Sequence, residues 1–143
     1  MAMIVRCFRD RDIDEVYEVE MLSFKDPYPK PLLVFYSRLE PEGFLVAECD
    51  SRVVGYVIGV RERGYCHIIS IAVHPAYRRK GIGSALLKKL IEIMEHKGLT
   101  SFLLEVRVSN TAAINLYRRF GFRIVRRIPS YYKDGEDCFV MVR

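Results

Sequence analysis

The stretch from His67 to Leu87 constrains the fold of this chain more than any other segment. It reads as an apolar strand, a turn at Pro75, a basic loop that contains glycine, and then an amphipathic helix. A helix N-terminus has backbone N–H groups without partners and the positive end of the helix dipole, so it can hold a phosphate. Gly81 and Gly83 have no Cβ, so a ligand can approach the backbone closely there. The segment therefore predicts a pyrophosphate-binding turn between a strand and a helix.

Three cations, Arg78, Arg79 and Lys80, add positive charge to the same turn. The turn has neither the G-x-x-x-x-G-K-[ST] pattern of a Walker loop nor the G-x-G-x-x-G pattern of dinucleotide-binding folds. Its pattern is Arg78-x-x-Gly81-x-Gly83. The simpler alternative is a basic turn in which glycine assists the helix start. The position between an apolar strand and an apolar-periodic helix favours phosphate binding.

Length and composition indicate one globular domain over residues 1–143. Half of the residues are hydrophobic, which excludes a disordered chain. The apolar runs are too short to cross a bilayer, and the first residues lack the apolar segment of a secretory signal, so we expect a cytoplasmic protein without a membrane partner. The net charge of +5 fits nucleic acid or a polyanionic cofactor. The basic residues are not interleaved with aromatic residues in one strip, which favours the cofactor.

The four cysteines, Cys7, Cys49, Cys66 and Cys138, are widely spaced and form no C-x-x-C pair. This spacing argues against zinc or a redox dithiol, and no other metal ligand set stands out. In a reducing cytosol they are expected to be four core thiols. A cysteine nucleophile is the alternative, but the spacing does not support one.

Apolar periodicity divides the rest of the chain into strands and helices. Strands are predicted over residues 4–8, 44–49, 53–60, 65–73, 102–108, 122–128 and 138–142. Helices are predicted from Asp10 or Asp12 to about residue 22, and over residues 32–39, 81–97 and 112–120. In the first helix the residues at helical spacing are Ile13, Val16, Tyr17, Glu20 and Met21. The unit from residue 65 to 108 should be a right-handed parallel crossover, so the sequence predicts a mixed α/β (α+β) sheet that is otherwise antiparallel.

Two side chains on the predicted strands are candidate bases. Glu105 interrupts an apolar strand, and burial would raise its pKa, although an ion pair with Arg107 or another arginine is an equal alternative. His67 has an ordinary pKa near neutrality, as a base needs. By simple alternation it shares a strand face with Tyr65, Ile69 and Ile71. A hydrogen-bonded core histidine is the alternative for His67.

Tyr117 is a candidate proton donor. It lies on the short helix that follows Asn110, and its phenol can donate to a departing group. The alternative is a core aromatic residue, because Leu116, Tyr117 and Phe120 have near-helical spacing.

The Arg78-x-x-Gly81-x-Gly83 pattern resembles the [Q/R]-x-x-G-x-[G/A] signature of the GNAT superfamily of acyl-CoA-dependent N-acyltransferases. The run from Leu104 to Phe122, with L-E-V-R-x-S-N and N-x-x-A-x-x-L-Y-x-x-x-G-F, is similar to N-terminal acetyltransferases of the ribosomal-protein-alanine (RimI-like) type. The resemblance covers residues 4–141. It implies the GNAT fold, with a mostly antiparallel sheet, one splayed parallel β-α-β unit and helices on both faces.

The resemblance also implies acetyl-CoA as cosubstrate, no metal, and direct attack of an amine in a ternary complex. Glu105 would be the general base, His67 would act through a water, and Tyr117 would protonate the coenzyme sulfur. Asn110 would contact the pantetheine arm or set the loop that faces it. The implied coenzyme-binding residues are Ile71, Ala72, Val73, Arg78, Arg79, Lys80, Gly81, Ile82, Gly83, Ser84, Asn110 and Tyr117.

The acceptor side is implied by the same resemblance. Phe24, Tyr28, Tyr131 and Tyr132 would lie in the two loops that flank the acceptor cleft. The acidic run after Tyr132 resembles that of the same enzymes, except that Cys138 stands where the family has alanine. Packing within a hairpin is the alternative for this tyrosine pair.

The expected reaction is acetylation of the α-amine of a protein or peptide N-terminus, with a ribosomal protein as one candidate. We expect a monomer or weak dimer that needs no nucleic acid. One alternative is a GNAT enzyme that acts on lysine side chains, polyamines or a small-molecule amine. The other is a non-catalytic acyl-CoA sensor or RNA-contacting module, against which Glu105 and Tyr117 together argue.

Overall fold

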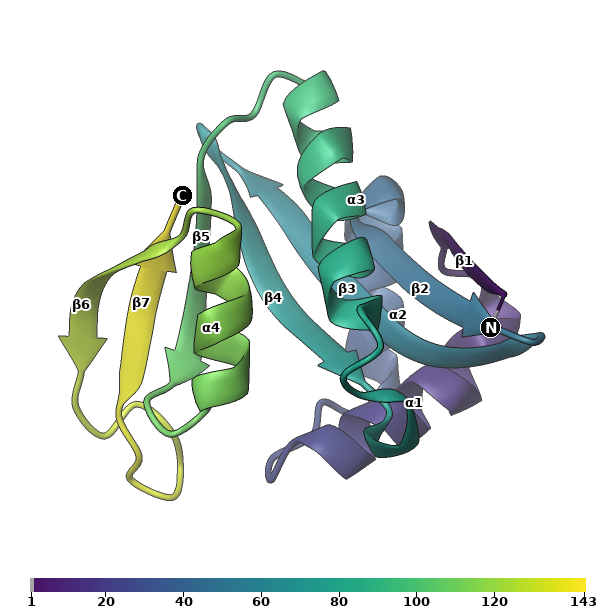
Figure 1. Cartoon of the computed structure of the whole chain (residues 1–143), viewed down its shortest axis with the longest axis horizontal. Helices are drawn as coiled ribbons and strands as arrows, with labels where there is room; N and C mark the ends of the chain where they lie inside the picture. The colour runs from purple at the N-terminus through teal and green to yellow at the C-terminus, as the bar shows by residue number, and fades with distance from the viewer. Residues whose placement is uncertain (1) are drawn as a thin grey trace.

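The computed structural model describes residues 2–143, and a mixed β-sheet runs through them (Figure 1). Its strands are β1 (Met3–Cys7), β2 (Phe44–Cys49), β3 (Arg52–Glu62), β4 (Tyr65–Val73), β5 (Phe102–Arg107), β6 (Arg123–Ile128) and β7 (Cys138–Val142). Their order across the sheet is β1-β2-β3-β4-β5-β7-β6. Neighbouring strands are antiparallel except β4 and β5, which are parallel. The predicted fold class, a mostly antiparallel mixed sheet with one parallel β-α-β unit, is confirmed.

Helices cover both faces of this sheet, as predicted. The helices are α1 (Ile13–Ser23), α2 (Lys30–Leu39), α3 (Ile82–His96) and α4 (Thr111–Arg119). Figure 1 shows α3 and α4 in front of the sheet and α1 and α2 behind it. Short 3-10 turns at Asp10–Asp12, Pro41–Gly43 and Pro75–Tyr77 lead into α1, β2 and the loop before α3. The boundaries differ from the predicted ones by no more than one helical turn.

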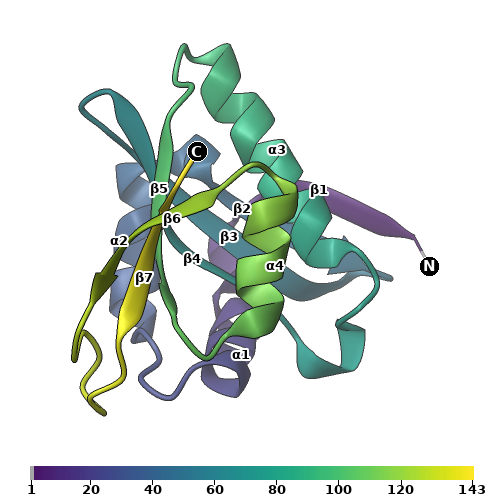
Figure 2. The same ribbon diagram turned by 60° about the vertical axis from the view of Figure 1, so that its left-hand side comes forward.

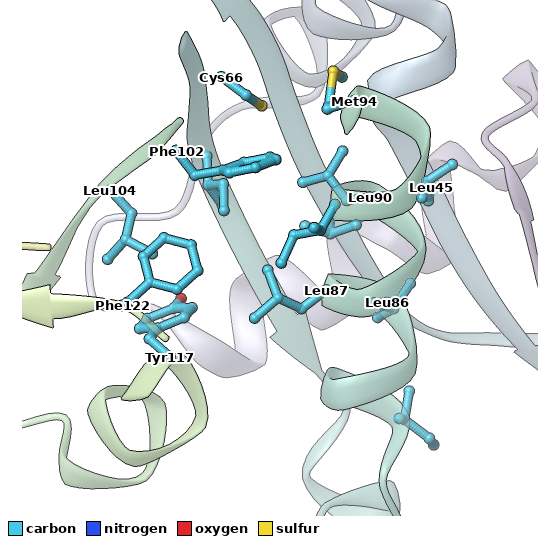
Figure 3. Packing of buried hydrophobic residues seen from close by; sticks show 14 of the residues in the cluster. Leu45, Cys66, Leu86, Leu87, Leu90, Met94, Phe102, Leu104, Tyr117 and Phe122 are labelled. Carbon is cyan, nitrogen blue, oxygen red and sulfur yellow. The ribbon is translucent and has the colours of Figure 1, made fainter. Parts of the chain in front are cut away.

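Each face of the sheet has its own apolar core. On the α3/α4 face, Leu86, Leu90 and Met94 of α3 are fully buried and belong to the same cluster as Leu104 and Phe122 (Figure 3). Burying each leucine contributes roughly 1.5–3 kcal/mol, so this stripe, more than helix propensity, holds α3 on the sheet. The α1/α2 face has a smaller core of Val16, Val19, Leu33, Phe44, Val46, Val53, Tyr56, Ile58, Val60 and Ala72.

The start of α1 and the cysteines differ from expectation. Asp12 is the N-cap of α1, but its carboxylate makes no cap hydrogen bond to that helix. It accepts bonds of 2.8 and 2.9 Å from Arg6 and of 2.8 Å from the Arg9 N–H, which ties β1 to the start of α1. Cys49, Cys66 and Cys138 are buried, whereas Cys7 is exposed. The prediction of four core thiols was wrong for Cys7, which ends β1, a strand at one edge of the sheet.

A β-bulge interrupts the alternation of β4. Ile58 pairs with Ser70 and Gly59 pairs with Ile68, so Ile69 is the extra residue. A bulge shifts the side-chain alternation by one residue. Ile69 therefore packs with the α1/α2 core, while Ile71 packs with the α3/α4 core. The prediction that Ile71 shares a face with Ile69 and His67 was wrong for this reason.

The parallel strands β4 and β5 separate soon after they meet. They pair only over Cys66–Ile68 and Phe102–Leu104. Figure 1 shows the two strands diverging toward their carboxyl ends. A bulge also bends its strand, which accounts for the divergence just beyond Ile68. The backbone of residues 71–73 thus has β3 on one side and no strand partner on the other. We call this opening between β4 and β5 the splay.

Candidate active site

The parallel pairing of β4 with β5 brings His67 and Glu105 together. His67 Nε2 lies 2.8 and 2.9 Å from the two carboxylate oxygens of Glu105. The pair is on the α1/α2 face, because the neighbours Leu104 and Val106 belong to the core on the opposite face. The hydrogen bond with Glu105 raises the pKa of His67 above its ordinary value of 6.5, outweighing the opposite effect of burial. A hydrogen bond therefore links the imidazole of His67 to the carboxylate of Glu105 at the edge of the splay.

Arg107, the alternative partner of Glu105, is engaged elsewhere. Its Nη1 lies 2.9 Å from Asp134 Oδ2 and 2.8 Å from Glu136 Oε1. Its guanidinium also lies 4.0 Å from the centre of the Tyr132 ring. Arg107 thus holds the β6–β7 connection, residues 129–137, against β5. It does not pair with Glu105, whose partner is His67.

Tyr117 approaches the splay from the opposite face of the sheet. It lies on α4, and its ring is 5.8 Å from that of Phe122, beside Leu104 (Figure 3). Only 5% of the residue is exposed, and burial raises the pKa of its phenol, so it keeps its proton near neutral pH. Within the described chain the hydroxyl has no hydrogen-bond partner, and it is not sealed from solvent. Tyr117 is therefore a core aromatic residue whose hydroxyl remains available as a donor.

The turn before α3 exposes a row of backbone donors. Arg79 and Gly81 both adopt left-handed conformations, with φ of 64° and 80°. From residue 78 to residue 84, no backbone N–H finds an acceptor within residues 2–143. A Cβ on Gly81 would meet no atom within 4 Å, whereas one on Gly83 would lie 3.4 Å from Leu116 of α4. The turn therefore presents free amides toward open space, as an anion site requires.

Two of the three cations of this turn have different contacts. Arg78 Nε donates to the Val73 carbonyl at 3.0 Å, and its Nη2 lies 3.4 Å from Ser23 Oγ of α1. Arg78 therefore ties the turn to the end of β4. Lys80 lies 5.6 Å from the centre of the Tyr77 ring, so its charge stays at the turn.

Asn110 begins α4, the helix that carries Tyr117. Its side-chain oxygen accepts the Ala113 N–H at 3.2 Å, which is an N-cap hydrogen bond. This bond sets the direction of α4 from the loop after β5. Asn110 was expected either to contact the pantetheine arm or to set the loop that faces it. This hydrogen bond supports the second role.

The predicted acceptor residues lie in two loops, residues 24–29 and 129–137, at the same end of the sheet (Figures 1 and 2). Lys25 Nζ and Asp134 Oδ2, 3.2 Å apart, join them. Tyr28 is half-buried, and burial together with nearby groups that include Glu105 raises its pKa to about 12. The pKa of Tyr131 is raised by burial and then by Glu105. The loops thus bring these tyrosines within electrostatic range of the His67–Glu105 pair.

The other predicted acceptor residues line the same loops. Phe24 follows the end of α1 and packs against the α1/α2 core. The rings of Tyr131 and Tyr132 meet edge to face, with centres 5.0 Å apart. The sequence-predicted residues therefore lie at the splay, on the turn before α3 or its first helical turn, at the N-cap or on the body of α4, or in these two loops.

Sequence reasoning missed a polar cluster beneath the first loop. Glu20 of α1 is buried with Val16, whereas Met21 is exposed. The Glu20 carboxylate accepts hydrogen bonds from Tyr56 of β3 and from the Tyr28 N–H. The sequence feature that could have revealed this cluster is the presence of carboxyl and phenol side chains within apolar runs.

Other features of the described chain lie away from this site. One surface hollow is lined by Arg6, Asp12 and Glu48 among others, and a second lies near Glu42 and Lys97. No group of three His, Cys, Asp or Glu side chains within residues 2–143 could hold a metal ion. None of the helices in this range combines the length and apolar character needed to span a membrane.

Residues 13–122 match the model of the acetyltransferase (GNAT) family. An uncharacterized N-acetyltransferase of Methanocaldococcus jannaschii is 44% identical, with 99% of this chain and 91% of the relative covered. An N-alpha-acetyltransferase of Sulfurisphaera tokodaii is 38% identical, with 96% and 90% covered. A putative [ribosomal protein bS18]-alanine N-acetyltransferase of Bacillus subtilis is 37% identical, with 96% and 92% covered.

Solved structures show the same similarity. Ard1 from Thermoplasma volcanium superposes with a TM-score of 0.96 at 33% identity, covering 100% of this chain and 97% of that one. A putative acetyltransferase from Salmonella typhimurium, solved with its cofactor acetyl-CoA, has a TM-score of 0.84 at 25% identity, with 100% and 94% covered.

Proposed function

This chain belongs to the GNAT acetyltransferase family and is an acyltransferase, and on that premise we propose that it acetylates the α-amine of protein or peptide N-termini with acetyl-CoA. One observation carries the proposal. The His67–Glu105 pair and Tyr117 lie on opposite faces of the sheet, where β4 and β5 separate. A base on one face and an acid on the other suit a reaction in which acceptor and coenzyme enter from opposite sides and meet in the splay.

On the α3/α4 face, the free amides of residues 78–84 would hold the coenzyme pyrophosphate. Residues 71–73, which lack a strand partner toward β5, would bind the pantetheine arm through their backbone. Tyr117 and Asn110 flank the far side of that path on α4. The similar Salmonella enzyme, solved with acetyl-CoA, supports this assignment of the cosubstrate.

In the proposed reaction the amine nitrogen attacks the thioester carbonyl, and a C–N bond replaces the C–S bond. Glu105 takes the amine proton, directly or through His67 and a water. Tyr117 gives its proton to the departing sulfur and regains one from solvent. Backbone N–H groups in the splay stabilise the charge that develops on the carbonyl oxygen.

The acceptor would enter from the α1/α2 face, between the loops that carry Tyr28 and Tyr131. These aromatic loops, joined by Lys25 and Asp134, narrow the entrance around a chain end. An α-amine has an ordinary pKa near 8 and a lysine side chain about 10.4, so a modest base suffices only for the former. The names of the archaeal and Bacillus relatives support the same acceptor.

The proposal extends to the whole chain. We propose one acetyltransferase domain over residues 1–143, a monomer or weak dimer that needs no nucleic acid. Three of its four free cysteines are buried thiols, which suits a reducing compartment such as the cytoplasm. A ribosomal protein is a candidate acceptor because the Bacillus relative is named for one.

The first prediction tests the acceptor class. With acetyl-CoA, short peptides with free N-termini should be acetylated, and matched peptides with a blocked N-terminus and an internal lysine should react little. Mass spectrometry of a peptide library measures both and shows which first residues are accepted. Equal rates on blocked peptides would favour the lysine alternative, and coenzyme binding without turnover of any amine would favour a sensor.

The second prediction tests the turn before α3. Gly81→Asp places a negative charge and a side chain where the pyrophosphate would lie. Repulsion between charges a few ångströms apart near a protein surface is worth about 1–4 kcal/mol, so the acetyl-CoA KM should rise by about fivefold or more. Gly64→Asp is a matched control, because Gly64 also has a left-handed φ, 88°, and open space around it. An unchanged KM in folded Gly81→Asp, measured by initial rates, would exclude the turn as the coenzyme site.

A further inference from the structure

Glu20 is a buried carboxylate that none of the proposed steps uses. It lies on α1 and is 1% exposed. In residues 2–143 no lysine, arginine or histidine forms an ion pair with it, and burial raises its pKa. A buried carboxylate without a cation is costly, so its presence calls for a reason.

The contacts of Glu20 join three other segments. Its Oε2 accepts the backbone N–H of Tyr28 at 2.8 Å. Its Oε1 accepts the Tyr56 hydroxyl, which lies 3.1 Å from Ser70 Oγ. The chain of hydrogen bonds therefore runs from the first acceptor loop through α1 and β3 to β4.

Both ends of this series of hydrogen bonds lie where the acceptor would meet the thioester. Tyr28 belongs to the loop of residues 24–29, which is joined to the other acceptor loop through Lys25. Ser70 follows the bulge residue Ile69. It immediately precedes residues 71–73, which pair with β3 but have no strand partner on the side of β5, at the splay. The bulge turns Ser70 toward the α1/α2 face, the face of the His67–Glu105 pair.

Building on the proposed function, we propose that Glu20 is a positioning residue that sets the distance between the acceptor loop and the splayed segment of β4. By holding the Tyr28 backbone against Tyr56 and Ser70, it fixes how deeply an N-terminus can enter before its amine reaches the thioester. The role belongs to the hydrogen-bonding geometry of the carboxylate and does not require its charge.

Two substitutions separate geometry from charge. The carbonyl of glutamine in Glu20→Gln can still accept the Tyr28 N–H, and its amide NH₂ can donate to Tyr56, which then donates to Ser70. The charge is lost while the connection remains. In Glu20→Met the side chain has a similar length but neither accepts nor donates well, so the connection is lost with the charge.

The experiment compares KM and kcat of the wild type and both variants, for acetyl-CoA and for the best acceptor peptide of the wild type. For Glu20→Met, an unsatisfied buried donor predicts a rise in peptide KM of about tenfold or more, with the acetyl-CoA KM changed by less than about twofold. Glu20→Gln should restore the peptide KM to within about threefold of the wild type. Equal defects in both variants would show that the charge matters and would overturn the proposal, as would a normal peptide KM in Glu20→Met.

Two further measurements keep the test decisive. If Glu20→Met does not fold, Tyr56→Phe removes only the hydroxyl that holds Oε1, and a peptide KM unchanged in that variant would contradict the proposal. A wild type that acetylates no peptide would count against the proposed function instead. Hydrogen exchange of the Tyr28 amide would then decide the inference: protection kept in the wild type and Glu20→Gln but lost in Glu20→Met supports it, and equal protection in all three overturns it.

Discussion

Replacing Glu105 by glutamine should lower kcat/KM for a peptide acceptor by about 10²- to 10⁴-fold, the range for a positioned general base. Glutamine keeps the shape and can still accept a hydrogen bond from His67, so the sheet should remain intact. The loss should appear with the acetyl-CoA KM nearly unchanged, because Glu105 lies on the face opposite the coenzyme turn. Steady-state kinetics with thermal unfolding as a folding check measures both effects.

The same variant makes a prediction about pH. In the wild type the carboxylate raises the pKa of His67 above 6.5, so the pair loses its base form as the pH falls through that raised value. In Glu105→Gln the largest cause of the rise is gone, and burial, which lowers the pKa of a histidine, then outweighs the smaller rise caused by Glu62. The acidic limb of the residual kcat/KM profile should therefore shift to lower pH.

His67→Phe provides the comparison for Glu105. If deprotonation runs through Glu105, the loss at His67 should be the smaller of the two. A larger loss at His67 would reverse the assignment of the dominant base. Near-normal kcat/KM in folded Glu105→Gln would remove Glu105 from the reaction altogether.

Tyr117→Phe should lower kcat by roughly 10²-fold or more, because it removes the proposed proton donor for the coenzyme sulfur. The acetyl-CoA KM should change little. The ring contact with Phe122 is kept, and the lost hydroxyl has no partner within the described residues, so the melting temperature should stay close to that of the wild type. Burst and steady-state kinetics, together with thermal unfolding, test all three expectations.

Tyr17→Phe is a suitable control for this variant. It also removes one tyrosine hydroxyl, but from α1, where Tyr17 contacts Lys30 through its ring. Its kcat should equal that of the wild type. A folded Tyr117→Phe enzyme with near-normal kcat would leave Tyr117 with its packing role alone.

Local sequence patterns predicted the elements and the class of the fold. Apolar residues at a spacing of two or of three to four mark the strands and helices, and this periodicity depends only on neighbours along the chain. The same holds for the turn before α3, where Gly81 adopts the left-handed φ that glycine tolerates best. Resemblance to a known family then indicated which residues of these elements to consider for the site.

Partners across the sheet were not predictable in this way. Glu105 has an arginine two residues away, yet its partner is His67, 38 residues distant in sequence. Which of the two it meets depends on the register of the parallel strands β4 and β5, and because a helix joins these strands, no hairpin turn fixes that register. The ion pairs of Arg107 with the acidic residues of the β6–β7 connection were not predictable for the same reason.

The sequence by itself determined the strands, the helices, the glycine-containing turn before α3 and the family of this protein, because each rests on short-range patterns. Only the tertiary structure decided that a bulge at Ile69 turns Ile71 to the opposite face, and that the separation of β4 from β5, expected from the family resemblance, begins just beyond Ile68. It also placed the His67–Glu105 pair on one face and Tyr117 on the other, and connected Glu20 to the acceptor loop. These features depend on one extra residue in a strand and on contacts between distant segments, which exist only once the sheet has formed.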